Sequence, residues 1–340
     1  MRYSLLDFYR YFAALTVCVS HFIFNYNKSL HFEFTSILGV ELFFILSGFV
    51  LAPQILKLQI NINKNLKIFL LRRWIRTIPP YLVALFCAAI LIGFGDYRNL
   101  LKFLTYTQNF FSDSPSRNFF SVAWSLSVEE WFYIILPLLI FINQNSKHKV
   151  LKLNVLSICI VIILVLNLLR LFYNSENLDW GEDIRRSVLL RIDSLCFGVV
   201  AYIVKDKISK KILLIIFNLF LIPILYLIIK PNVLINFIFV QNLFLPTCAI
   251  CFSSLLILLT NNDIESLWLK KFSSFGANIS YSMYLFHIFF IPFTLNIFNN
   301  VFFSLIIYLF LLKIFCWIFY VFFEKPLLKS RPKYESLSNN

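Results

Sequence analysis

Charged side chains are scarce in this chain of 340 residues. They make up 14% of it, and only 17 residues are acidic. A soluble domain has about 25% charged and roughly 45 to 50% apolar residues, whereas here 60% are apolar and the mean hydropathy is +0.79. A water-soluble fold cannot bury that much apolar surface, so the composition excludes a soluble protein and indicates an integral membrane protein.

Signals for processing, cross-linking and domain division are also missing. The first apolar run lacks a small-x-small cleavage site and carries Asp7, Arg10 and His21, so we interpret it as a membrane helix and not as a signal peptide. All seven cysteines fall inside apolar segments, which gives no sign of a disulfide framework. Without repeats or linkers, we expect one membrane domain over 1–340, with a short cytoplasmic tail at 324–340.

Long apolar runs are what the sequence does contain. Each is close to the roughly 20 residues that cross about 30 Å of hydrocarbon as a helix. The sequence therefore predicts an all-α, polytopic bundle of about ten transmembrane helices between about residues 5 and 323. Their approximate bounds are 5–25, 36–56, 77–95, 122–142, 153–173, 188–204, 212–229, 237–259, 280–298 and 301–323.

The formal charge of +14 could suggest a nucleic-acid partner. The basic residues lie between apolar runs, however, and not on an amphipathic face or in a basic tail, so we expect no nucleic acid. Most of them fall on one side of the membrane if the N-terminus is cytoplasmic, with a basic loop from Lys57 to Arg76 on that side. The positive-inside rule then places both termini in the cytoplasm.

Ionisable residues inside membrane helices are costly, and each is a functional hypothesis. Arg10 and His21 are eleven residues apart, which brings them to within about 20° of one helix face, roughly 16 Å apart along the axis. Asp7 lies one turn before Arg10. Either this face carries an acid, a base and a reactive imidazole, or Asp7 and Arg10 form a local ion pair and His21 is an interfacial histidine.

Three arginines follow the second apolar run. Arg72 and Arg76 are four residues apart and Arg73 and Arg76 are three apart, so their guanidinium groups can converge on one anion. Such a cluster suits phosphate groups, including those of coenzyme A. The alternative is a cytoplasmic anchor that contacts anionic lipid.

Carboxylates also occur in the apolar segments. Glu129 begins the apolar part of the fourth expected helix, and the predicted topology puts it in the outer half of the membrane with Glu41 and His21. A carboxylate beside an imidazole would orient it as a general base. The alternative is that these acids sit in interfacial water.

Several motifs, in this order, resemble the membrane-bound acyltransferase-3 family, and in particular the bacterial O-acetylases of O-antigens, capsules and exopolysaccharides. They are the Asp7–His21 pattern, Gly39–Phe49, Leu71–Tyr81, Trp124–Tyr133, Arg191–Gly198, Ser280–His287 and Glu324-Lys325-Pro326. The resemblance covers almost the whole chain. One departure is Glu41, where many relatives have Asp; no extra soluble esterase-like domain accompanies the motifs.

The resemblance implies that Arg10 and His21 form the family's Arg-x10-His motif, with His21 catalytic. It also implies that Arg73 and Arg76 form the Arg-x-x-Arg motif associated with the acyl-CoA donor, and that Glu129 is a motif position. The expected residues are as follows: catalytic His21, Arg10, Glu129 and Asp7; donor-binding Arg72, Arg73 and Arg76; substrate-binding Glu41, Trp124, Ser125, Tyr133 and His287. No metal site is expected.

The expected function is transfer of an acetyl group from cytoplasmic acetyl-CoA to a hydroxyl of a cell-surface or lipid-linked glycan, in the bacterial inner membrane. His21 would act as general base or as the carrier of an acyl group. Segments 97–121 and 174–186 would select the acceptor. The alternative is a transporter or flippase, because intramembrane charges also mark translocation paths.

Overall fold

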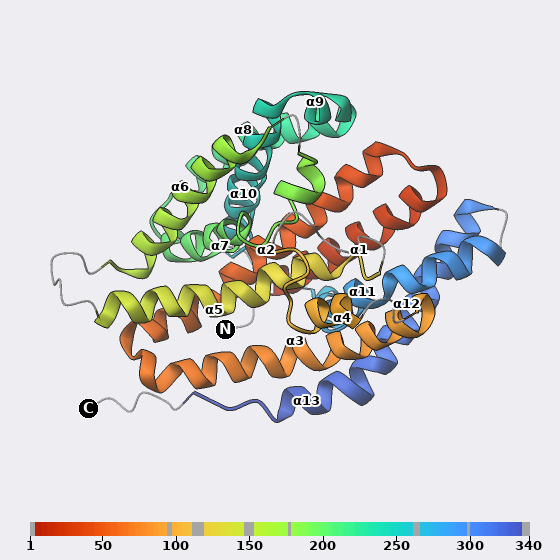
Figure 1. Ribbon diagram of the computed structural model, residues 1–340, viewed down its shortest axis with the longest axis horizontal. Helices are drawn as coiled ribbons and strands as arrows, with labels where there is room; N and C mark the ends of the chain where they lie inside the picture. Colours follow the sequence, from red (N-terminus) through yellow and green to blue (C-terminus); the bar gives the residue numbers. More distant parts are fainter. Residues whose placement is uncertain are drawn as a thin grey trace.

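The computed structural model describes residues 4–93, 97–110, 119–145, 153–175, 178–260, 266–297 and 300–334, and within them it is helical with no strand. The helices are α1 (Ser4–Asn27), α2 (Leu30–Ile60), α3 (Ile62–Ile92), α4 (Tyr97–Leu104), α5 (Ala123–Asn145), α6 (Val155–Tyr173), the π-helix η2 (Trp180–Ile184), α7 (Ile192–Val204), α8 (Lys210–Ile229), α9 (Pro231–Asn236), α10 (Ile238–Thr260), α11 (Leu267–Ile297), α12 (Val301–Phe319), the π-helix η3 (Tyr320–Glu324) and α13 (Lys325–Lys329). Figure 1 shows them as one bundle.

Seven helices in the described part are long and apolar enough to cross a membrane: α2, α3, α5, α6, α8, α10, and α12 continued to Lys329. This confirms a polytopic helical membrane protein but does not support ten spans. The expected spans 5–25, 188–204 and 280–298 fall on α1, α7 and α11, which are not among the seven. α7 has only 13 residues, and the apolar parts of α1 and α11 are interrupted by polar side chains that the bundle buries.

The spanning helices differ in how far the bundle encloses them. Of the most apolar stretch of α2, 72% is buried, against 22% for α6 and 17% for α8. α2 packs against α1 and α7 in the interior, and α1 packs against α11, whereas α6 and α8 lie at the edge (Figure 1). The expected motifs on α1, α2, α5 and α11 are therefore in the enclosed part of the bundle.

Two glycines set the distance between α2 and α7. A β-carbon on Gly48 would overlap the backbone of Leu195, and one on Gly198 would overlap the backbone carbonyl of Ile45. Only glycine lets two helix backbones approach this closely in a membrane. This contact fixes the part of α2 that carries Ser47 of the site described below.

The charge of the basic stretch 57–76 had led us to expect a loop, but the structure shows two helices there. α2 runs to Ile60 and α3 begins at Ile62, so that only Asn61 separates them. The Asn61 side chain accepts a hydrogen bond from the backbone N–H of Lys64 at 3.0 Å and thereby caps α3. The arginine cluster consequently projects from a continuous helix, which gives its side chains fixed directions.

The segment after η3 is not a free tail either. α13 packs against α3, and Arg72 Nη1 donates a hydrogen bond to the carbonyl oxygen of Pro332 at 2.6 Å. The ring of Tyr334 lies under Lys57, with 4.6 Å from Nζ to the ring centroid. The C-terminal segment Arg331–Tyr334 thus covers the end of the α2–α3 hairpin; residues 335–340 lie outside the described residues.

Candidate active site: an arginine pocket and a histidine cavity

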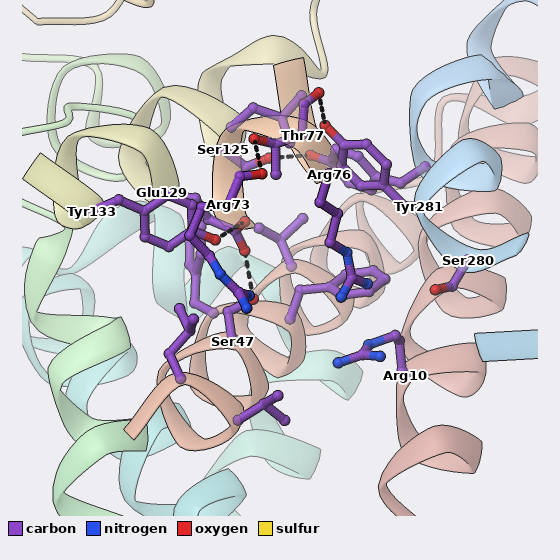
Figure 2. A pocket seen from close by; sticks show the side chains of 17 residues that line it. Arg10, Ser47, Arg73, Arg76, Thr77, Ser125, Glu129, Tyr133, Ser280 and Tyr281 are labelled. Carbon is purple, nitrogen blue, oxygen red and sulfur yellow. Dashed lines mark hydrogen bonds between the residues drawn. The ribbon is translucent and has the colours of Figure 1, made fainter. Parts of the chain in front are cut away.

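One pocket gathers residues from five helices: α1, α2, α3, α5 and α11. We call it the arginine pocket. It is lined by Arg10, Val40, Phe43, Phe44, Ser47, Val50, Leu51, Arg73, Arg76, Thr77, Ser125, Leu126, Glu129, Tyr133, Ser280, Tyr281 and Tyr284. Figure 2 shows the guanidinium groups of Arg10, Arg73 and Arg76 pointing into the same space from α1 and α3. The Asp7–His21 and Leu71–Tyr81 motifs therefore meet in this pocket.

The three guanidinium groups are poorly matched by protein partners. Arg73 Nη2 donates to Gln54 Oε1 at 3.1 Å, and its Nε is buried without a hydrogen-bond partner. Arg10 and Arg76 form no hydrogen bond or ion pair with any residue that the structure describes. A pocket with unpartnered, planar cations is suited to bind phosphate or carboxylate groups.

Arg72, which we expected to join this cluster, does not line the pocket. Its guanidinium group is directed to the C-terminal segment, where it bonds to Pro332 and lies 5.5 Å from the ring centroid of Tyr334. The spacing argument failed because Arg72 and Arg73 are adjacent on a helix and so point about 100° apart. Arg10, which we had grouped with His21, takes its place.

Glu129 also lies in the arginine pocket and not beside His21. It accepts hydrogen bonds from the hydroxyl of Ser47 at 2.6 Å and from that of Tyr133 at 3.0 Å (Figure 2). Its carboxylate faces the three arginines, and the pocket lining carries no other acidic residue. The predicted Glu129–His21 contact is therefore absent from the described structure, while Ser125 and Tyr133 do line the same pocket as Glu129.

His21 opens to a second space, which we call the histidine cavity. It is lined by His21, Phe24, Asn25, Glu33, Ser36, Ile37, Val40, Leu91, Ser121, Val122, Trp124, Glu182, Arg185, Arg186, Tyr284, Ile288, Phe289, Ile291 and Pro292. Val40 and Tyr284 line both spaces. The two cavities are therefore neighbours, with the side chains of these two residues at their boundary.

A second histidine replaces the carboxylate that we expected beside His21. His21 Nδ1 and His287 Nε2 are 2.8 Å apart, and His287 Nδ1 is 2.8 Å from the carbonyl oxygen of Tyr284. A carbonyl oxygen can only accept, so His287 Nδ1 carries a proton. With both rings neutral, His287 Nε2 accepts from His21 Nδ1–H, which leaves the lone pair on His21 Nε2. This arrangement orients His21 as a base.

His287 itself was expected to contact substrate. It is fully buried and lines neither cavity. Its ring meets that of His21 edge to edge, with centroids 5.1 Å apart and planes inclined by 19°. His287 can therefore reach a ligand in the cavity only through the His21 ring to which it is hydrogen-bonded.

The boundary between the cavities carries two hydroxyl groups. Ser125 Oγ and the Tyr284 hydroxyl are 2.5 Å apart, and Tyr284 donates to the carbonyl oxygen of Val122 at 3.1 Å. These contacts join α5 to α11 at the level where the spaces meet. Ser125 lines the arginine pocket and Tyr284 lines both spaces, so this pair of hydroxyls lies where the two cavities adjoin.

The wall of the histidine cavity holds charges of both signs. Arg186 and Glu182 form an ion pair, and Glu33 lines the same space. Arg185 is 5% exposed and lies over the ring of Trp124, with 5.2 Å from Cζ to the centroid. Burial and the neighbouring Arg186 lower the pKa of Arg185 to about 9, which leaves it charged at neutral pH.

Besides Arg72 and His287, two more residues of the predicted site lie outside both cavities. Glu41 is fully buried, forms an ion pair with Arg191 and accepts a hydrogen bond from Ser194 at 3.3 Å, so it ties α2 to α7. Asp7 is buried one turn before Arg10. Neither lines a cavity. Trp124 does, on the histidine side.

Other lining residues were missed from the sequence. Arg185 and Arg186 lie in the segment 174–186, which we had expected to select the acceptor but in which we read no pattern. The available signal was a pair of adjacent arginines just after Glu182 and Asp183, in a polar segment between two apolar runs. Tyr284 falls inside the Ser280–His287 motif, and only the fold shows that it lies at the boundary. Among the described residues, no group of three or more His, Cys, Asp or Glu could hold a metal ion.

Comparison with known proteins finds a family model for nearly the whole chain and individual relatives for parts of it. A family model described as an acyltransferase domain, acyltransferase 3, matches residues 3–322. The peptidoglycan O-acetyltransferase OatA of Listeria monocytogenes is 29% identical over 169 residues, which are 43% of this chain and 26% of that protein. The O-acetyltransferase OatA of Staphylococcus aureus is 26% identical over 232 residues, 61% of this chain and 36% of that protein.

A Haemophilus influenzae protein of uncharacterised function is 27% identical over 143 residues, 37% of this chain and 58% of that protein. The matched regions thus span between about a quarter and three fifths of these relatives' own lengths. No solved structure matches the chain.

Proposed function

The chain belongs to the acyltransferase-3 family, and we propose that it transfers an acetyl group from acetyl-CoA to a hydroxyl group of a cell-envelope glycan. The observation that supports this most directly is the pairing of two neighbouring cavities. One is lined by three cations and the other by a histidine with an oriented lone pair, and they meet at Val40 and Tyr284. A donor with phosphates and an acceptor with a hydroxyl require such a pair of sites.

We propose the orientation that the positive-inside rule favours, with about ten membrane crossings and both termini in the cytoplasm of a bacterium. α1, α7 and α11 would complete the spans, because a helix enclosed by other helices does not need an apolar surface all round. The arginine pocket then opens to the cytoplasm, where acetyl-CoA is made, and the histidine cavity opens to the outer side of the inner membrane.

The donor's phosphates would bind to Arg73, Arg76 and Arg10. One further cation lies close to them in the C-terminal region. The guanidinium of Arg331 has its Nε and one Nη buried without a hydrogen-bond partner, and burial together with Arg76, Arg73 and Arg72 lowers the pKa of Arg331 to about 9. Like charges held this close repel one another, and a ligand with several phosphates relieves that repulsion.

In the proposed reaction, His21 Nε2 removes the proton of the acceptor hydroxyl, and the hydroxyl oxygen attacks the thioester carbonyl carbon. The tetrahedral intermediate collapses with cleavage of the C–S bond, and the departing thiolate takes up the proton held by His21. His287 keeps His21 in the required tautomer. A relay in which His21 first carries the acetyl group uses the same residues.

Glu129, Tyr133 and Ser47 would position the donor-side arginines and balance part of their charge. Asp7 and Glu41 would act further away, by holding α1 and α2 in place. The name of the Listeria monocytogenes relative gives peptidoglycan as that protein's acceptor. A glycan of the cell envelope is the corresponding acceptor class here, and membrane lipids surround the chain.

The test is transfer of labelled acetyl from acetyl-CoA to envelope glycan in membranes that contain the wild-type chain, His21→Ala or His31→Ala at matched expression. His31 is an exposed histidine that bonds to the carbonyl oxygen of Ile228 and lines neither cavity. We expect label with the wild type and with His31→Ala, and none above background with His21→Ala.

Full transfer by His21→Ala would overturn the mechanism. Movement of a glycan or an acylated metabolite across the membrane without consumption of acetyl-CoA would instead favour a transporter or flippase.

A further inference from the structure

Three arginines on the side of the bundle that carries the histidine cavity are almost fully buried. Arg170, Arg191 and Arg185 are 1%, 0% and 5% exposed. Arg170 is paired with Asp193 at 2.5 Å, and Arg191 is paired with Glu41. Arg185 has no such carboxylate: among the described residues its guanidinium forms no hydrogen bond or ion pair, and its Nε is buried and unsatisfied.

A buried cation without a counterion is strongly unfavourable. The acids near Arg185 do not supply the missing partner. Glu182 is paired with Arg186 at the partly exposed wall of the cavity, and Glu33 lines the cavity as a half-exposed side chain that forms no hydrogen bond with Arg185 in the described structure. Arg185 lies over the ring of Trp124, and both side chains line the histidine cavity.

We propose that Arg185 binds an anionic group of the acceptor, a carboxylate or a phosphate, and thereby places the acceptor hydroxyl beside His21. The proposal rests on the proposed function. The acceptor is then an acidic glycan, or a glycan joined to a phosphorylated lipid carrier. Both sources offer planar or tetrahedral oxygens that match the two-nitrogen edge of a guanidinium group.

The remainder of the histidine cavity fits a sugar attached to that anion. Trp124 supplies an aromatic ring, and Asn25, Ser36 and Ser121 supply hydrogen-bonding side chains on the same lining. Sites for small polar ligands combine apolar and aromatic walls with a few polar groups that fix orientation. Arg185 provides the single buried, unpartnered charge in this set, and His21 provides the base.

The experiment measures binding of matched probes to the purified full-length chain in nanodiscs by isothermal titration. The first pair is N-acetylmuramic acid and N-acetylglucosamine, which differ by a lactyl carboxylate. The second pair is farnesyl diphosphate and farnesol, which differ by the phosphates. The variants are Arg185→Gln and Lys230→Gln; Lys230 is exposed and lines neither cavity, so the second variant removes the same charge elsewhere.

In the wild type we expect the charged member of one pair to bind about tenfold or more tightly than its neutral partner. This preference should vanish in Arg185→Gln and persist in Lys230→Gln. Arg185→Lys keeps the charge but loses the two-nitrogen edge of the guanidinium group, so it should retain part of the preference for the charged probe. It replaces Arg185→Gln as the test variant if the Gln variant does not fold. Preference for the carboxylate identifies an acidic sugar, and preference for the diphosphate identifies a lipid carrier.

Equal affinity within both pairs, absence of binding by every probe, or a preference that survives Arg185→Gln would overturn the proposal. Titration of coenzyme A separates this result from the proposed function. If the wild type binds coenzyme A but shows no preference for the charged probes, the inference about Arg185 fails while the acetyltransferase proposal stands. If coenzyme A does not bind, the proposed function fails whatever the probes do.

Discussion

The arginine pocket and the histidine cavity share Val40 and Tyr284 but are built differently. The arginine pocket presents three cations against a single carboxylate, and two of these cations have no partner among the described residues. The histidine cavity balances acids and bases in its wall and contains one imidazole that a hydrogen bond orients. The first is suited to hold a polyanion, and the second is suited to move a proton.

This difference predicts that substitutions in the two cavities will affect different kinetic parameters. Changes beside His21 should lower kcat, because they alter a group used in the transition state. Changes in the arginine pocket should raise KM for the donor, because they remove binding energy that is present before and during the reaction.

The largest effect is expected for His21→Gln. Loss of a general base lowers a rate by about a hundredfold to ten-thousandfold, and glutamine keeps a polar side chain of similar size. The measurement is kcat for acetyl transfer from acetyl-CoA in nanodiscs, with coenzyme A binding as a check on the fold. If kcat falls less than threefold, or if only KM changes, the proposed division between the cavities is wrong.

The second effect concerns His287, which is buried and reaches the reaction only through His21. His287→Leu removes the acceptor for His21 Nδ1–H and frees the other tautomer, so we expect kcat to fall by about tenfold to a hundredfold with KM for acetyl-CoA unchanged. His287→Gln offers a carbonyl oxygen in nearly the same place and should restore much of the rate.

Equal kcat values for the Leu and Gln variants would contradict a tautomer role for His287 and leave it a packing residue. A shift of the pH profile of kcat in His287→Leu relative to the wild type is the additional sign of an imidazole that has lost its fixed hydrogen bond.

The His21–His287 contact also shows where sequence reasoning stopped. The two residues are 266 positions apart, on α1 and α11, and helical spacing relates only residues of one helix. The ordered motifs did predict that the first helix, the arginine cluster and the Glu129 segment contribute to a site, and the structure brings Arg10, Arg73, Arg76 and Glu129 into one pocket.

The same reasoning gave Glu129 the wrong neighbour. It estimated the depth of each residue in the membrane from the ends of the expected spans. α2 and α3 are longer than those spans, because they run from Leu30 to Ile60 and from Ile62 to Ile92. Composition identified a membrane protein, but the apolar runs 5–25 and 280–298, which we counted as spans, fall on α1 and α11, and neither helix is among the seven apolar enough to span. Helices enclosed by others carry the polar side chains of the site, so the weakest spans by hydropathy are those that carry the histidine pair.

The third prediction tests the arginine pocket. Arg76→Gln and Arg73→Gln should each raise KM for acetyl-CoA by about tenfold, because each removes a charge-assisted hydrogen bond to a phosphate, and kcat should change less than threefold. Lys67→Gln is the matched control, since Lys67 is an exposed cation on the same helix and outside the pocket. A fall in kcat with constant KM would give these arginines the same kinetic role as His21. The distinction between a donor-binding pocket and a catalytic cavity would then be wrong.

The smallest effect is expected at the C-terminal segment, where Arg331 lies near the arginines of α3. Arg331 is partly exposed, so solvent screens its interaction with a ligand, and Arg331→Gln should weaken coenzyme A binding by only about threefold to tenfold. Lys333→Gln removes an equal charge from an exposed side chain two residues away and should change the affinity by less than twofold.

Comparison of coenzyme A with its analogue that lacks the 3′-phosphate shows which part of the donor Arg331 meets. If Arg331 contacts that phosphate, the Gln variant binds the two ligands with equal affinity, whereas the wild type distinguishes them. If the wild type does not distinguish them, Arg331 contacts either the diphosphate or no part of the donor. An unchanged affinity for coenzyme A in Arg331→Gln would then show that Arg331 makes no contact with the donor. In that outcome the donor site ends at Arg10, Arg73 and Arg76, and the C-terminal segment serves only to hold Arg72 away from the pocket.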